Sequence, residues 1–195
     1  MELQFSPYDA QFIVFVDDTD VPSVRLPEIP KAVVAEIHTP WEVKFQRQRG
    51  APEGMALDTL TSYTASSDEG VKYFSGTATY TNAFNLSKKL FRRKARPKRI
   101  VLDLGDVRDL AEVYVNGRKQ GVAWRAPFRM DVTDAVKPGH NSLTVKVVNV
   151  WHNRLVGDVQ PGARPVAWTQ VDFYKPDEPL LEAGLLGPVK IEAEY

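Results

Sequence analysis

The fold is decided by residues 99–149, which read RIVLDLGDVRDLAEVYVNGRKQGVAWRAPFRMDVTDAVKPGHNSLTVKVVN. Four runs in this stretch alternate apolar and polar side chains. Their apolar members are Ile100, Leu102 and Leu104, then Ala111, Val113 and Val115, then Phe128, Met130 and Val132, then Leu143, Val145 and Val147. Because successive side chains of a strand point to opposite faces, a period of two predicts strands with one buried face.

Strong turn signals separate these runs. The dipeptide Asn116-Gly117 accepts the positive φ angles of a type I′ turn, and a further strand resumes at Arg118. Pro138-Gly139 provides the turn before the last run. Short strands joined by tight turns predict an all-β fold, and a β-sandwich is the natural arrangement.

The segments before this stretch add strands and one connection. Trp41, Val43 and Phe45 share one strand face, which makes Trp41 a core anchor rather than a ligand platform. Residues 71–84 alternate again and predict a long strand or a bent pair of strands. Residues 46–67 are polar and irregular, so we expect a loop there.

Residues 1–30 are expected to form an N-terminal strand and a linker. The apolar run FIVFV at residues 12–16 has a strand composition but no partner nearby in the sequence. A polar segment with Pro22, Pro27 and Pro30 follows, and its composition is typical of an extended linker. We therefore expect the sandwich over residues 31–195, with residues 1–30 as an edge strand or as a remnant of a preceding domain.

Composition narrows the classes of partner. The 195 residues contain 25 Lys and Arg and 25 Asp and Glu, so the net charge favours neither nucleic acid nor an anionic membrane. The basic run at residues 88–99 is interpreted as a solvated loop, the alternative being a nucleic-acid patch for which no stacking motif is present. The absence of cysteine excludes disulfides, and no segment has the pattern of a membrane span or a signal peptide.

Several motifs together resemble a known family. They are GVKYFSGTATY, VLDLGDVRDLAEVYVNG, PFRMDVTDAVKPG, VWHNRLVGD and GLLGPVKIE, and they run from Gly70 to the C-terminal end. They resemble the sugar-binding domain of family 2 glycoside hydrolases, and more closely the C-terminal β-sandwich of the family 106 α-L-rhamnosidases. The chain departs from that pattern at Arg125-Ala126 and at His152, which are mild changes in loops.

The resemblance implies a galactose-binding-domain-like jelly roll in an extracellular or periplasmic protein. Its implied partners are an oligosaccharide or polysaccharide and the catalytic domain of a parent glycoside hydrolase. The catalytic acids of such enzymes belong to a separate barrel, so the resemblance implies no catalytic residue and no required cofactor here. A structural Ca²⁺ is the one metal that it suggests, at an unspecified loop.

The candidate ligand residues lie mainly in one long connection. Residues 151–187 show no clear periodicity, and long unpatterned loops are usually functional or packed against another domain. The candidates there are Trp151, Asn153, Arg154, Asp158, Trp168 and Tyr174. Aromatic rings stack on the C–H faces of sugars, and Asn, Arg and Asp bond their hydroxyls. The alternative is that these residues hold the loop or face another domain, with Arg154 paired to Asp158.

Trp124, just beyond the predicted hairpin, is a second aromatic candidate, with core packing as its alternative. Catalysis by this chain alone is not expected, because the carboxylates of Asp103, Asp106, Asp109 and Glu112 fall on strand faces and turns without an implied pocket. Two functions therefore remain open. The chain is either a carbohydrate-binding module or a structural domain that supports a catalytic barrel.

Overall fold

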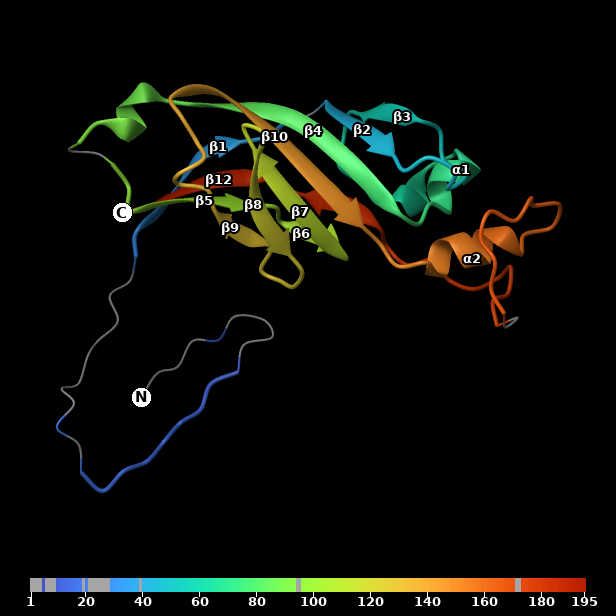
Figure 1. Cartoon of the computed structure of the whole chain (residues 1–195), viewed down its shortest axis with the longest axis horizontal. Helices are drawn as coiled ribbons and strands as arrows, with labels where there is room; N and C mark the ends of the chain where they lie inside the picture. The colour runs from blue at the N-terminus through green and yellow to red at the C-terminus, as the bar shows by residue number, and fades with distance from the viewer. Residues whose placement is uncertain are drawn as a thin grey trace.

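The computed structural model describes residues 5, 10–18, 20, 29–38, 40–93, 96–170 and 173–195. The chain folds as a β-sandwich of two antiparallel sheets with a short strand pair at one side (Figure 1). The first sheet has the order β3-β2-β4-β10-β7-β8, formed by Gly54–Leu57, Trp41–Phe45, Thr77–Leu86, Gly139–Val148, Leu110–Val115 and Arg118–Ala123. The second has the order β1-β12-β5-β9, formed by Lys31–Glu36, Lys190–Glu194, Arg99–Asp103 and Arg129–Asp131. These layers confirm the all-β prediction.

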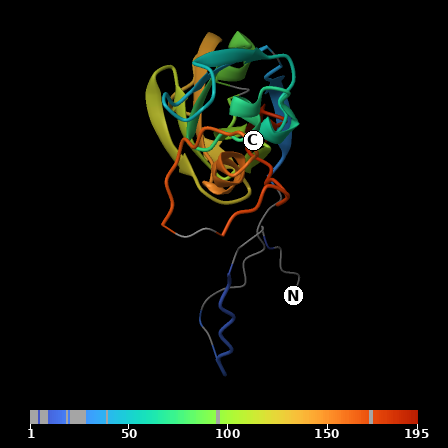
Figure 2. The same ribbon diagram turned by 90° about the vertical axis from the view of Figure 1, so that its right-hand side faces the viewer.

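The remaining elements are short. Strands β6 (Asp106–Arg108) and β11 (Gly184–Gly187) form the two-stranded sheet. The helical turns are η1 (Tyr63–Ala65), α1 (Glu69–Lys72) and η2 (Lys88–Phe91), and α2 (His152–Asp158) follows β10. Figure 2 looks onto the end of the sandwich that carries α2, where the connection after this helix loops out beneath it.

The stretch that decided the prediction forms half of the larger sheet, β10-β7-β8, together with β5 and β9 of the smaller sheet. Strand β10 pairs with β4 over ten residues and with β7 on its other side. The turn between β7 and β8 has Asn116 at φ 52° and Gly117 at φ 76°, as a type I′ turn requires. The side chains at the predicted inward positions, such as Val113, Val115 and Leu143, are fully buried.

The core contains a polar pair of tyrosines among its aromatic residues. Trp41 is fully buried, as predicted, and its ring meets Tyr80 edge-on. The Tyr80 hydroxyl donates to the Tyr63 hydroxyl at 2.8 Å and accepts from the Leu185 N–H at 3.1 Å. Burial raises the pKa of Tyr80 to about 12 and also raises that of Tyr63 well above its usual value. Both phenols are therefore neutral at ordinary pH.

The N-terminal strand prediction is wrong for residues 12–16, which form no strand and are exposed. An isolated strand has no partner for its backbone hydrogen bonds, so an apolar composition alone does not stabilise it. Parts of residues 1–30, including residues 21–28 of the expected linker, lie outside the described residues. The domain boundary near residue 30 stays a prediction.

Two other segments contain more structure than expected. Residues 71–84 are not strand throughout, because Asp68 caps α1 by accepting the Val71 N–H at 3.1 Å, and β4 begins only at Thr77. Residues 46–67 contain β3 and η1. In both places a capping side chain or a partner strand outweighs the local pattern.

Candidate functional site

The loop between β8 and β9 walls a surface cavity of about 340 Å³, here called the Trp124 hollow. Its walls include Trp124, Arg125, Pro127, Arg129 and Met130. The Trp124 side chain is 70% exposed, so the core-packing alternative for this residue is wrong. An exposed indole on the wall of a cavity of this size offers a flat apolar face to a small ligand.

Two guanidinium groups accompany this indole. The Arg125 guanidinium lies 5.9 Å from the ring centre of Trp124. Arg129 is ion-paired with Glu192 and lies 3.7 Å from Asp103 and 3.6 Å from Glu194, which fixes it against the outer face of the smaller sheet. The Trp124 hollow therefore combines an apolar face with hydrogen-bond donors.

A second cavity, here called the Arg154 hollow, lies beside α2 and has a volume of about 320 Å³. Its walls come from separate segments of the chain. They include Gly50, Glu69, Tyr73, Arg154, Gly157 and Arg164. Arg154 is the one predicted ligand residue on these walls.

Arg154 and Asp158 are paired one helical turn apart. The Arg154 side chain is 7% exposed, and its Nε lies 2.9 Å from Asp158 Oδ1. The carboxylate of Asp158 also accepts the Val166 N–H at 3.0 Å and the Ala167 N–H at 2.8 Å. Asp158 thus faces inward and holds the connection after α2, which is the alternative in which these residues hold the loop.

Asn153 has the same kind of role. Its side chain is buried, its Nδ2 donates to the Leu181 carbonyl at 2.7 Å, and its Oδ1 accepts the Leu181 N–H at 2.8 Å. His152, the residue before Asn153, contacts the Pro179 carbonyl through its Nε2 atom, and its ring meets that of Tyr174 edge-on. These contacts tie the end of the connection to the helix and leave Tyr174 half-buried.

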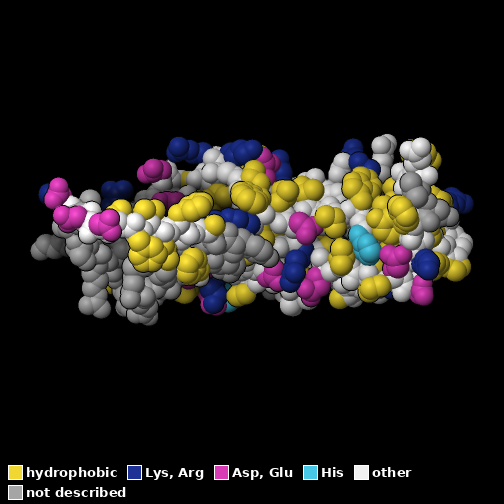
Figure 3. Space-filling view, turned by 90° about the horizontal axis from the view of Figure 1, so that it is seen from below, with side chains coloured by type: hydrophobic (Ala, Val, Ile, Leu, Met, Phe, Trp, Pro, Cys, Tyr) yellow, Lys and Arg dark blue, Asp and Glu magenta, His cyan; other side chains and the backbone are white. Residues whose placement is uncertain are grey.

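The two other predicted aromatics are exposed but do not wall either hollow. Trp168 is 84% exposed. Trp151 is 41% exposed, and one face of its ring is covered by the Arg49 guanidinium at 4.6 Å. Further exposed apolar residues nearby in the sequence are Val150, Val166, Phe173 and Leu181. Figure 3 shows apolar side chains gathered over the end of the molecule that carries α2.

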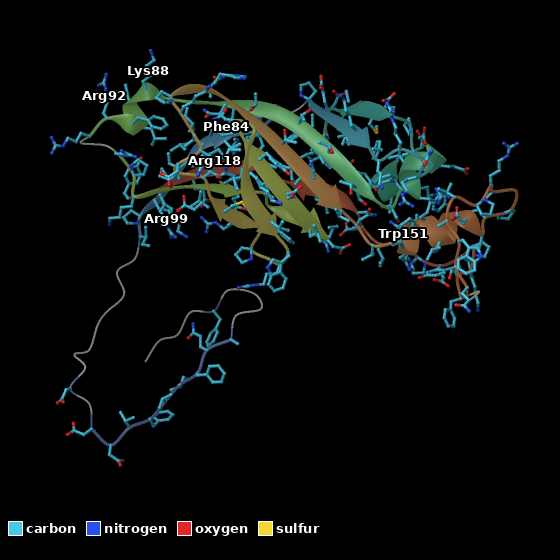
Figure 4. The ribbon with its side chains drawn as sticks, in the orientation of Figure 1. Phe84, Lys88, Arg92, Arg99, Arg118 and Trp151 are labelled. Carbon is cyan, nitrogen blue, oxygen red and sulfur yellow. The ribbon has the colours of Figure 1, made fainter. Side chains whose placement is uncertain are left out.

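The basic run lies at the opposite end of the sandwich. Figure 4 shows Lys88, Arg92 and Arg99 at one end and Trp151 at the other. The described cations of the run are exposed, while Leu90 and Pro97 are buried and anchor the segment. Residues 94 and 95 lie outside the described part.

Three of the four carboxylates considered for catalysis form ion pairs, and the fourth, that of Asp109, accepts the Val150 N–H at 3.0 Å. Asp106 binds Arg108 at 2.7 Å, and Glu112 pairs with Lys119 and Lys146. Within the ranges that the structure describes, no group of three His, Asp or Glu side chains is placed to hold a metal ion, and the suggested Ca²⁺ stays a prediction. Within the same ranges, no helix is long and apolar enough to cross a membrane.

Sequence reasoning missed the contribution of Gly50, Tyr73 and Gly157. These residues surround the Arg154 guanidinium, and none of them carries a recognisable binding motif. The apolar and polar residues of α2 are too few to show a helical period, since the helix spans only seven residues.

The chain is similar to parts of known glycosidases. The family described as "Glycosyl hydrolase 2 galactose-binding domain-like" matches residues 60–171. A putative beta-glucuronidase from Formosa agariphila is 42% identical over 178 residues, which covers 77% of this chain and 15% of that protein. A rhamnosidase structure from Novosphingobium sp. PP1Y has 42% identity and a TM-score of 0.81, covering 89% of this chain and 16% of that one.

A more distant structure shows the fold alone. The beta-D-glucuronidase of Dictyoglomus thermophilum has 18% identity and a TM-score of 0.58, covering 87% of this chain and 29% of that one. This chain therefore spans only a small part of the length of the glycosidases that it matches.

Proposed function

Because this chain belongs to the glycosyl hydrolase 2 galactose-binding-domain-like family, we propose that it is a non-catalytic carbohydrate-binding module. It would act within a polysaccharide-degrading glycoside hydrolase outside the cytoplasm. The supporting observation is the Trp124 indole, 70% exposed on the wall of a cavity of about 340 Å³. The exposed ring face is apolar area that a stacked ligand can bury.

The Trp124 hollow offers a flat ring face beside guanidinium donors, a combination that suits a sugar ring. The apolar C–H face of a pyranose stacks on an indole, and its hydroxyls accept from guanidinium donors such as those of Arg125 and Arg129. The cavity volume corresponds to a small ligand. The similar proteins are named as a rhamnosidase and a putative beta-glucuronidase, so rhamnose and glucuronic acid are the first sugars to test.

Affinity electrophoresis on rhamnose-containing plant polysaccharides tests this proposal. Trp124→Ala is expected to lower affinity about tenfold, which corresponds to about 1.4 kcal/mol. Trp168→Ala is the matched control, because it removes an exposed indole that walls neither hollow. A wild-type chain that binds no polysaccharide would contradict the proposal, and binding that survives Trp124→Ala would place the site elsewhere.

The second candidate function is a structural domain that packs against a catalytic barrel. The exposed apolar residues at the α2 end favour it, because such a surface in a folded domain is typical of a contact with another domain. Absence of sugar binding together with protection of Trp168 from solvent quenchers in a longer parent protein would support this role.

A further inference from the structure

The Arg154 guanidinium is buried without a complete set of acceptors. Its side chain is 7% exposed, and the Nε–H is not directed at Asp158 Oδ1 although the two atoms lie 2.9 Å apart. Among the described residues, Nε is the Arg154 nitrogen that is fully buried without a hydrogen-bond partner, whereas Nη1 and Nη2 are not fully buried. A guanidinium stays charged in a protein, so buried N–H groups without acceptors are costly.

The residues around Arg154 do not supply the missing acceptors. Both oxygens of Asp158 already accept backbone N–H groups, from Val166 and Ala167. Glu69 is exposed on the rim of the hollow and forms no ion pair with Arg154 in the described part of the chain. Nη1 and Nη2 are not among the fully buried atoms without a partner, so they border the hollow and can donate to a ligand that enters it.

Two glycines keep space around these nitrogens. A Cβ atom at Gly50 would lie 2.8 Å from Arg154 Nη1, and a Cβ atom at Gly157 would lie 2.6 Å from Nη2. On another side, the ring centre of Tyr73 lies 6.0 Å from the guanidinium carbon. The cavity of about 320 Å³ on which Arg154 borders has room for a monosaccharide.

We propose that the Arg154 hollow binds the carboxylate of an acidic sugar, a uronate, at a site separate from the Trp124 hollow. The two terminal nitrogens of a guanidinium form a planar fork that matches a carboxylate with two parallel hydrogen bonds. Arg164 adds a second cation at the rim, and Glu69 is the anion on the walls. The inference rests on the proposed carbohydrate-binding function and assigns a sugar class to a second site.

Ligand-observed NMR titration of the whole chain tests the site. The probes are D-glucuronate and D-galacturonate, with D-glucose, D-galactose and acetate as comparisons. Glucuronate or galacturonate is expected to bind about tenfold more tightly than its neutral counterpart, and this advantage should shrink at high salt. Equal binding of charged and neutral sugars would overturn the proposal. So would acetate binding as tightly as the uronates, because the hollow would then hold a bare carboxylate from any source.

Surface variants test the sign of the charge effect without disturbing the buried guanidinium. Glu69→Gln is expected to tighten uronate binding about twofold to threefold, and Arg164→Gln to weaken it by a similar factor. Asp58→Asn is the matched control, since it removes an exposed carboxylate that does not wall the hollow. An unchanged or weakened affinity in Glu69→Gln would overturn the proposal. Arg154→Lys should abolish uronate binding, provided that circular dichroism shows the variant folded.

The two proposals fail separately. Uronate binding that survives Trp124→Ala but responds to Glu69→Gln supports the Arg154 hollow even if the Trp124 hollow binds nothing. Uronate binding that is lost in Trp124→Ala and unaffected by Glu69→Gln overturns this inference and leaves the proposed function standing.

Discussion

The Trp124 hollow and the Arg154 hollow have nearly equal volumes, about 340 and 320 Å³, but the chain builds them in different ways. The first comes from residues 122–130, a single loop with the strand ends on either side of it. The second joins Gly50, the α1 region and residues 154–166. A cavity made by one loop needs only local structure, whereas one made by three segments needs all of them placed correctly.

The two hollows also differ in how their polar groups are supported. Arg129 in the Trp124 hollow forms ion pairs with three carboxylates on the face of the smaller sheet, those of Asp103, Glu192 and Glu194. Arg154 depends on one carboxylate, Asp158, which also holds two backbone N–H groups of the connection. Substitutions near Arg154 should therefore cost more stability than substitutions near Trp124.

Asp158→Ala should have the largest effect. It leaves the buried Arg154 charge without its partner and frees two backbone N–H groups, for an expected loss of about 3–5 kcal/mol of unfolding free energy. Chemical denaturation measures this loss. Asp106→Ala removes a carboxylate from an exposed ion pair and is expected to cost less than about 1 kcal/mol. Equal losses in the two variants would contradict the proposed dependence on Asp158.

The buried tyrosine pair should make the stability of the whole domain fall at alkaline pH. Below pH 10 the Tyr80 phenol is protonated in the folded and unfolded chain, so its titration does not affect stability. Between pH 10 and about 12 only the unfolded chain loses this proton, so stability falls as pH rises, by about 3 kcal/mol in total.

Hydrogen exchange across this range should rise together at residues near both hollows, because losing the core unfolds the whole domain. Tyr63→Phe removes the other buried phenol and should reduce the alkaline loss of stability measured by denaturation. An alkaline loss unchanged in this variant would show that Tyr63 does not contribute to it.

Asn153→Ala should have an intermediate effect, limited to the α2 end. It removes both hydrogen bonds to the Leu181 backbone, and the expected loss is about 1–3 kcal/mol. Hydrogen exchange should increase at Leu181 and leave the β7–β8 hairpin protected. Equal increases at both places would show that the two ends are more strongly coupled than their contacts indicate.

Gly117→Ala should have the smallest effect and test the Trp124 side. A Cβ atom there meets nothing within 4 Å, so the cost is only that of placing alanine at φ 76°, about 1 kcal/mol. Thermal unfolding measures it. A much larger loss would mean that the hairpin turn, and with it the Trp124 loop, tolerates substitution less well than its open surroundings indicate.

The sandwich could be predicted from the sequence because its strands follow local rules. The alternation around Val113, Val145 and Leu102 determines which face is buried, and Asn116-Gly117 determines the turn. The same rules failed for residues 12–16, where apolar composition has no partner strand, and for residues 71 and 72, which belong to a helical turn that Asp68 caps. Long-range contacts decide such cases, and a local pattern does not contain them.

The sequence by itself determined the fold class, the family resemblance and the types of residue in the long connection. Only the tertiary structure decided where those residues point. The Arg154 N–H donates to the Ser75 hydroxyl, 79 positions away, and the Asn153 amide donates to the Leu181 carbonyl, 28 positions away. Exposure of Trp124 and burial of Arg154 depend on which distant segments pack over them, because burial belongs to the folded surface and not to the residue.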